Sequence, residues 1–446
     1  MRLAVVSDTH FGDELCTLVG ADAAGEPSVG PGYEVLRGIV GRVDYLVMLG
    51  DILDFSVTGY EVAYRSAKAF FARLLADGIA QQVIYVPGNH DFDIWHTVEH
   101  QVNVINQLKQ GQLPRAFKRA VPGIIDDREG QTRNKLRLPD VTAKPEWHEN
   151  RRPYGNLFLD HITRLPATEG RPRAVGPKLP FNFAYPNLYL VTDAGESVLL
   201  THGHYFEAYW SLASDWAMRL ARDDLGLEEG ELSLQDMVGI NLPLNQLACS
   251  GIGQARPLTR VARAVQREAT AGRTDRLAKY LDRLERALRS GAGRSLPVRT
   301  VHAWALRWLS RRFLDSVATL ESSRYSADFT RRPAVRQRFR SYYRQSLGEL
   351  RRISESHGIR VPEPAHVVFG HTHQPIPWGS EELIDVVDGR TVRLCNTGGW
   401  IWNPAGGAQH FNGAEVLLYE TGRGIWSESV REPDLRRVPG SRTPVA

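Results

Sequence analysis

Five short clusters of Asp, Asn and His recur along the chain, and an apolar run precedes each one. They read SDTH (7–10), GDILD (50–54), GNHD (88–91), THGH (201–204) and GHTH (370–373). Neutral imidazole and carboxylate are ligands for borderline divalent metals such as manganese, iron and zinc, and a carboxylate can bridge two metals. The set is too large for one tetrahedral zinc. The clusters therefore indicate two metal ions.

The elements that must position these clusters follow from the hydrophobic pattern. Within the first 95 residues, strand-like runs at 3–6, 45–51 and 82–91 alternate with helical patterns at 33–43 and 61–78. This βαβαβ order predicts a parallel sheet whose strands end in site-forming loops. Further strand patterns follow, as a hairpin at 187–204 and as runs at 366–373, 391–399 and 415–430.

The ordered set DxH, GDxxD, GNHD, HGH and GHxH resembles the signature of the calcineurin-like metallophosphoesterase superfamily. The resemblance implies an α/β fold, a four-layer αββα sandwich with a dinuclear metal centre at one sheet end. It implies a first metal held by Asp8, His10, Asp51 and His373. It implies a second metal held by Asp51, Asn89, His202 and His371, with Asp51 bridging. We expect manganese, with iron and zinc as alternatives.

Two residues of the GNHD cluster have expected catalytic roles. His90 has no ligand role in the resemblance, so we expect it to donate a hydrogen bond or proton to the leaving oxygen, with Asp91 orienting its ring. Asp54 and His204 either orient ligands or cap local turns.

Another histidine pair lies outside the five clusters. His96 and His100 have helical spacing without a third ligand, which favours a helix surface.

Composition suggests three parts. Residues 1–204 are expected to form the first part of the catalytic core, with an irregular insertion at 111–186 that holds 10 of the 25 prolines. Residues 205–364 are expected to form a large helical, arginine-rich lid, and 365–446 the rest of the core. Within residues 254–360 there are 25 basic and 9 acidic side chains, a net charge of +16.

The lid sequence bears on the substrate. Trp304 and Trp308 fall opposite the apolar stripe of a helix at 301–320, so they pack on the core or meet an anionic amphiphile. A lid at this position resembles the helical cap of the UDP-2,3-diacylglucosamine pyrophosphohydrolases, and GNHDFDIW (88–95) is similar to the motif of their relatives.

We therefore expect a two-metal hydrolase of a phosphoester or pyrophosphate bond, acting on an amphiphilic or nucleotide-linked substrate, with peripheral contact to an anionic membrane. A nuclease of the same superfamily that binds nucleic acid through its arginines is the alternative, and a scaffold without metals is a remote one. The metal, the substrate and the oligomeric state stay open.

The expected cellular compartment is inferred from the cysteine content, the length of the apolar runs and the pattern of the first residues. The chain has three cysteines, too few for a disulfide framework, and no run of about 18 apolar residues. A strand pattern at residue 3 argues against a signal peptide. We expect a cytoplasmic protein.

Overall fold

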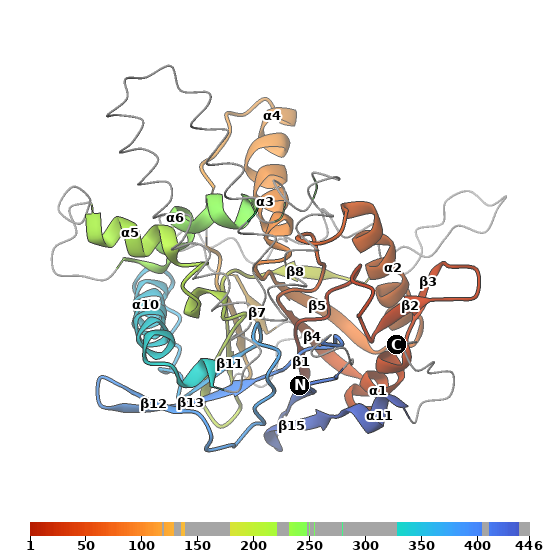
Figure 1. Ribbon diagram of the computed structural model, residues 1–446. Helices are drawn as coiled ribbons and strands as arrows, with labels where there is room; N and C mark the ends of the chain where they lie inside the picture. Colours follow the sequence, from red (N-terminus) through yellow and green to blue (C-terminus); the bar gives the residue numbers. More distant parts are fainter. Residues whose placement is uncertain are drawn as a thin grey trace.

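The computed structural model of the chain describes residues 1–117, 120–128, 135–138, 179–220, 232–247, 249, 254, 279, 328–403 and 410–436. Two β-sheets stack face to face, and helices cover their outer faces (Figure 1). The four layers follow from the alternation of side chains along each strand, since successive residues point to opposite faces. In β1, Leu3 and Val5 belong to the core between the sheets, whereas Ala4 and Val6 pack beneath the helices. The expected sandwich is confirmed.

The first sheet has the order β15-β14-β1-β4-β5-β8. Its strands are β15 (Gly424–Val430), β14 (Ala414–Glu420), β1 (Arg2–Val6), β4 (Val43–Leu49), β5 (Ala80–Val86) and β8 (Phe181–Phe183). β1, β4 and β5 are parallel, as the βαβαβ pattern predicts. Helices α1 (Pro31–Val40) and α2 (Tyr60–Ala76) connect them, and a ribbon of β2 (Val19–Ala21) and β3 (Pro27–Val29) precedes α1.

The second sheet has the order β12-β13-β11-β10-β9-β6-β7. Its strands are β12 (Ile384–Val387), β13 (Arg390–Asn396), β11 (His366–Phe369), β10 (Ser197–Thr201), β9 (Asn187–Val191), β6 (Gly123–Asp126) and β7 (Leu136–Arg137). The predicted hairpin is confirmed as the antiparallel pair β9 and β10. β10, β11 and β13 are parallel, so their carboxyl ends lie at one edge.

The described part of the segment 111–186 is more regular than the sequence suggested. It contributes β6 and β7 to the second sheet and β8 to the first. These strands have two to four residues each, too few for a periodic pattern to identify them.

The remaining helices surround the strand ends. They are α3 (Phe92–His100), the π-helix η1 (Gln101–Ile105), α4 (Asn106–Lys109), η2 (His204–Phe206), α5 (Leu212–Leu220), α6 (Leu234–Gln246), η4 (Phe329–Arg331), α10 (Pro333–His357) and α11 (Glu432–Arg436). Within the described ranges, no helix has both the length and the apolarity to cross a bilayer. Cys16, Cys249 and Cys395 are buried free thiols.

Helix α10 falls within the segment 205–364, and it packs directly on the second sheet. The Tyr342 hydroxyl lies 2.8 Å from Thr201 Oγ1 and donates to Asn187 Oδ1 at 2.7 Å. The buried carboxyl of Glu349 accepts from the Tyr189 hydroxyl at 2.8 Å. A hydrogen-bonded network therefore fixes α10 to strands β9 and β10. Trp304 and Trp308 lie outside the described residues, and the division into a core and a lid stays a prediction.

Candidate metal centre

The carboxyl ends of five strands bring the seven predicted metal ligands to one buried site. Asp8 and His10 follow β1, Asp51 follows β4, Asn89 follows β5, His202 follows β10, and His371 and His373 follow β11. Each of them is buried. Four come from the first sheet and three from the second, so the site bridges the two sheets.

One group of possible ligands consists of Asp8, His10 and His373. The Nε2 atoms of His10 and His373 lie 3.1 Å apart, and His373 Nε2 is 3.2 Å from Asp8 Oδ1. His10 Nε2 is 4.0 Å from the same oxygen. Two imidazole nitrogens and a carboxylate oxygen converge on one point, which is a donor set that suits a borderline divalent cation. We call these residues the first-metal side, after the first of the two metals that the sequence predicts.

A second group consists of Asp51, His202 and His371. His202 Nε2 lies 3.2 Å from Asp51 Oδ2 and 3.2 Å from Asn89 Oδ1. The amide oxygen of Asn89 therefore joins two histidines and a carboxylate. We call these four residues the second-metal side, and their mixed nitrogen and oxygen donors also suit such a cation.

The backbone of the ligands is strained. Asp8, His10, Asp51, His371 and His373 all have φ between 47° and 66°. Among the described non-glycine residues, only Asp388 shares this left-handed region. Such conformations are uncommon and cluster at functional sites. The strand ends therefore turn sharply in order to aim these side chains at one place.

The motif glycines allow close packing against the ligands. A Cβ atom at Gly88 would overlap the carboxylate of Asp51, and one at Gly370 would overlap that of Asp8. The glycines of GNHD and GHTH are thus required by the space that these two carboxylates occupy.

Three ligand histidines have one ring nitrogen held by an oxygen outside the centre. Nδ1 of His10 lies 2.8 Å from Asp54 Oδ2, and Nδ1 of His202 donates to the Leu49 carbonyl at 3.1 Å. His371 Nε2 lies 2.6 Å from Glu207 Oε2. Such contacts fix the ring orientation and tautomer of a metal-binding histidine. They leave Nε2 of His10 and His202 and Nδ1 of His371 as the candidate ligand atoms.

Glu207 was missed by the sequence analysis. It is almost fully buried, and it belongs to the turn after η2, outside the five clusters. No motif or periodicity marks it, because its position against His371 depends on a contact between residues 164 apart in the chain.

His90 lies beside the first-metal side, with its ring centroid 4.9 Å from that of His10. Its Nδ1 atom lies 3.0 Å from Asp54 Oδ1 and 2.7 Å from Ser56 Oγ. Burial opposes ionisation of Asp54, but the charges of His90 and His10 and their hydrogen bonds hold its pKa well below the usual range. Asp54 is therefore a carboxylate that orients both rings.

The expectation that Asp91 orients His90 does not match this geometry. The Asp91 carboxylate accepts hydrogen bonds from the backbone of Gly88 at 2.6 Å and Ile52 at 2.7 Å, and from the Tyr85 hydroxyl at 2.5 Å. Burial, then the charge of Asp51, raises its pKa to about 6. Asp91 precedes α3 and connects the GDILD and GNHD loops, while Asp54 contacts the His90 ring.

Two other histidine predictions can be placed. His204 is buried next to the second-metal side, with its ring centroid 5.5 Å from that of His202. The rings of His96 and His100 lie 6.2 Å apart on α3, and both pack on Phe117. In the described part of the chain, no third ligand joins this pair.

A family model for calcineurin-like phosphoesterases matches residues 1–241. The chain belongs to the calcineurin-like phosphoesterase family. It is accordingly a metal-dependent phosphohydrolase, and its buried His and Asp groups are the candidate metal ligands. The match ends before GHTH, yet the fold of this phosphoesterase returns that cluster to the same site. A search of curated proteins gives no match.

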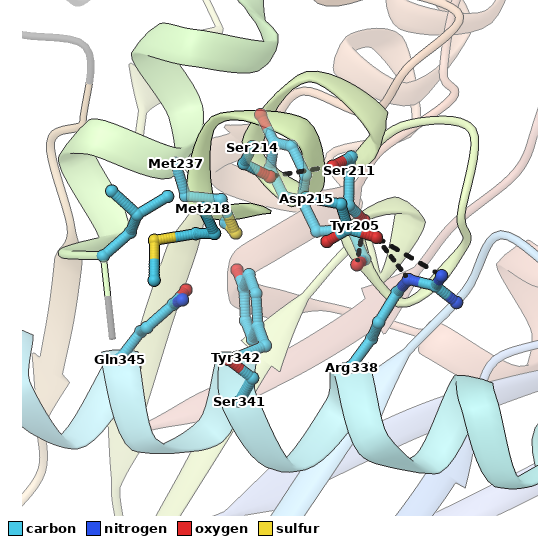
Figure 2. A pocket seen from close by; sticks show the side chains of 11 residues that line it. Tyr205, Ser211, Ser214, Asp215, Met218, Met237, Arg338, Ser341, Tyr342 and Gln345 are labelled. Carbon is cyan, nitrogen blue, oxygen red and sulfur yellow. Dashed lines mark hydrogen bonds and ion pairs between the residues drawn. The ribbon is translucent and has the colours of Figure 1, made fainter. Parts of the chain in front are cut away.

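A cavity lies between α5, α6 and α10 (Figure 2). It encloses about 490 Å³ of space free of protein atoms, part of it open to solvent. Met218, Met237 and the rings of Tyr205 and Tyr342 line it, and Asp215 and Arg338 form an ion pair at 3.3 Å. Tyr342 connects this cavity to Thr201, the residue before His202.

Proposed function

We propose that this phosphoesterase carries two divalent metals and hydrolyses a phosphoester or pyrophosphate bond of an amphiphilic or nucleotide-linked substrate. The observation that supports two metals is that two ligand groups without a shared residue, the first-metal side and the second-metal side, lie in one buried site. A third group, His10, Asp54 and His90, shares His10 with the first-metal side. Asp51 would bridge the two metals. Manganese is the proposed metal, since imidazole and carboxylate together suit it.

Bound divalent cations supply a nucleophilic water and neutralise charge on the phosphoryl oxygens. The protein residues provide the rest. Since Nδ1 of His90 faces Asp54, its Nε2 atom is the nitrogen that can hold a proton for the leaving oxygen. The Asp54 carboxylate would stabilise the protonated ring and keep it in one orientation. Asp91 would act indirectly, by fixing the loop that carries Asn89 and His90.

The cavity between α5, α6 and α10 supports a substrate with an apolar or aromatic part. Thioether and tyrosine surfaces suit such a group. A substrate similar to UDP-2,3-diacylglucosamine is one example of the amphiphilic, nucleotide-linked class that we propose.

A nuclease is the second candidate, favoured by the basic composition of residues 254–360. Three arginines of α10 in this range form ion pairs within the protein. Arg338 pairs with Asp215 at 3.3 Å, Arg340 with Asp385 at 2.7 Å and Arg344 with Asp388 at 2.9 Å. The charges of these three arginines are balanced by acidic side chains of the same chain, which favours the soluble or amphiphilic phosphate substrate over nucleic acid. Contact with an anionic membrane and a cytoplasmic location stay predictions.

Metal removal tests this proposal. Chelation should abolish hydrolysis of bis-p-nitrophenyl phosphate, and added manganese should restore it better than magnesium. A parallel panel of a nucleotide sugar, a phospholipid and single-stranded DNA then identifies the substrate class. Cleavage of the DNA alone would establish the nuclease. Protein that holds no transition metal and stays inactive when metals are added would refute the assignment.

A further inference from the structure

His204 is a buried histidine for which neither ring nitrogen has a hydrogen-bond partner among the residues that the structure describes. Its side chain is 1% exposed. The rings of His10, His90 and His202 are equally enclosed, yet each has a nitrogen bonded to a protein oxygen. Since an unpaired buried polar group destabilises the folded state, most such groups are paired with protein or with a bound molecule. His204 therefore needs a partner that the described residues do not provide.

The position of the ring indicates where this partner lies. Its centroid is 5.5 Å from that of His202 and 6.4 Å from that of His371, both on the second-metal side. Tyr205 and Trp210 pack against it at 4.0 and 6.4 Å. His90 occupies the corresponding place beside His10 on the first-metal side. The two histidines thus flank different ends of the centre.

A second unpaired donor lies on the same side. Asn89 is fully buried, and its Oδ1 atom faces His202 Nε2, while its Nδ2 atom has no hydrogen-bond partner. Two buried N–H donors without acceptors, beside a cation site, match the oxygens of a bound anion.

We propose that His204 contacts the substrate, with a ring N–H donating to an oxygen of its phosphate group on the second-metal side. This inference rests on the proposed phosphohydrolase function and adds a substrate contact to it. The contact binds and orients the phosphate group and involves no transfer of the proton.

The test replaces His204 with Phe, which keeps a ring against Tyr205 and Trp210 and removes both nitrogens. Loss of a hydrogen bond to a charged group should lower kcat/KM for bis-p-nitrophenyl phosphate about 10- to 100-fold. The affinity for inorganic phosphate, measured by calorimetry on the manganese-loaded protein, should fall by a similar factor. Metal content should not change. His96→Phe makes the same replacement outside the site and should have no effect.

A third variant, His204→Gln, retains an N–H donor and should recover part of the phosphate affinity. It also replaces the Phe variant if that one fails to fold. Unchanged phosphate affinity in a folded variant without the donor would assign His204 to packing, and loss of metal would assign it to the ligands; either result overturns the inference. If the wild-type protein hydrolyses no phosphate ester, the proposed function fails, while the phosphate measurement still tests the contact.

Discussion

The two sides of the metal centre are built from ligands of the same chemistry but held by different parts of the chain. On the first-metal side, Asp54 orients both His10 and His90, and it belongs to the GDILD motif itself. On the second-metal side, Glu207 orients His371 from a segment without a motif, and His204 and Asn89 keep unpaired nitrogens. On the first-metal side, the residue that orients the histidines is thus itself part of a sequence motif. The second-metal side depends on the segment that follows β10.

The largest expected effect comes from Asp51, the residue that we propose bridges the two metals. Asp51→Asn should reduce kcat/KM by more than the roughly 10²–10⁴-fold expected for loss of a general acid, because both metals lose a charged ligand. Metal analysis should show fewer ions per chain than for any other single ligand variant. Asp388→Asn makes the same change at a residue with similar backbone conformation, far from the site, and should retain full activity. A variant that loses one metal only would show that Asp51 does not bridge.

His90→Ala should lower turnover without the loss of metal that is expected for a variant of a metal ligand. Turnover should fall by roughly 10²–10⁴-fold while the metal content stays that of the wild type, since His90 supplies a proton rather than a metal bond. A substrate with a good leaving group should recover part of the rate, because its oxygen needs no proton. If His90→Ala empties the first-metal side, the ring is a ligand and its proposed role is wrong.

Variants of Asp54 and Glu207, the carboxylates that orient ligand histidines on the first-metal and second-metal sides, should differ in their effect on turnover. Removal of such a support typically weakens metal binding about 10- to 100-fold. Asp54→Asn should also lower turnover at saturating manganese, since Asp54 orients His90 as well. Glu207→Gln should recover wild-type turnover once manganese is saturating. Equal turnover in the two saturated variants would contradict the division between the sides.

The smallest effect on activity is expected from Glu349, which lies on α10 away from both sides. Burial raises its pKa to about 7, so the folded state holds a proton that the unfolded chain releases near pH 4.5. The contribution of Glu349 to the free energy of unfolding should therefore be largest below pH 4.5. It should fall by at most about 3 kcal/mol as the pH rises through 7. Glu349→Gln should flatten that fall in urea unfolding between pH 5 and 8. Glu355→Gln, at an exposed position of the same helix, is the control; an unaltered pH profile in Glu349→Gln would contradict the assignment.

The sequence predicts those strands and strand-end residues that a local pattern of apolar and polar residues marks. Apolar runs identify β1, β4 and β5, and the polar cluster after each run places Asp8, Asp51 and Asn89 at strand ends. Short strands such as β6 and β8 carry too few residues for a pattern. The contacts of Asp54 and Glu207 also lie beyond local pattern, because they depend on how loops from both sheets meet. Asp91 illustrates the limit: it is adjacent to His90 in sequence, yet its carboxylate faces Gly88 and Ile52.

The contact between η2 and α10 has a consequence for how such a protein can evolve. The rings of Phe206 and Phe339 lie 5.5 Å apart, although most of the segment 205–364 separates them in sequence. The two ends of this segment thus lie at neighbouring points of the sandwich, between the adjacent parallel strands β10 and β11. An insertion joined in this way can lengthen, shorten or exchange its sequence without changing the order of the strands that carry the ligands. Under the proposed function, selection can then alter substrate preference in one part of the gene while the hydrolytic chemistry is inherited unchanged in another.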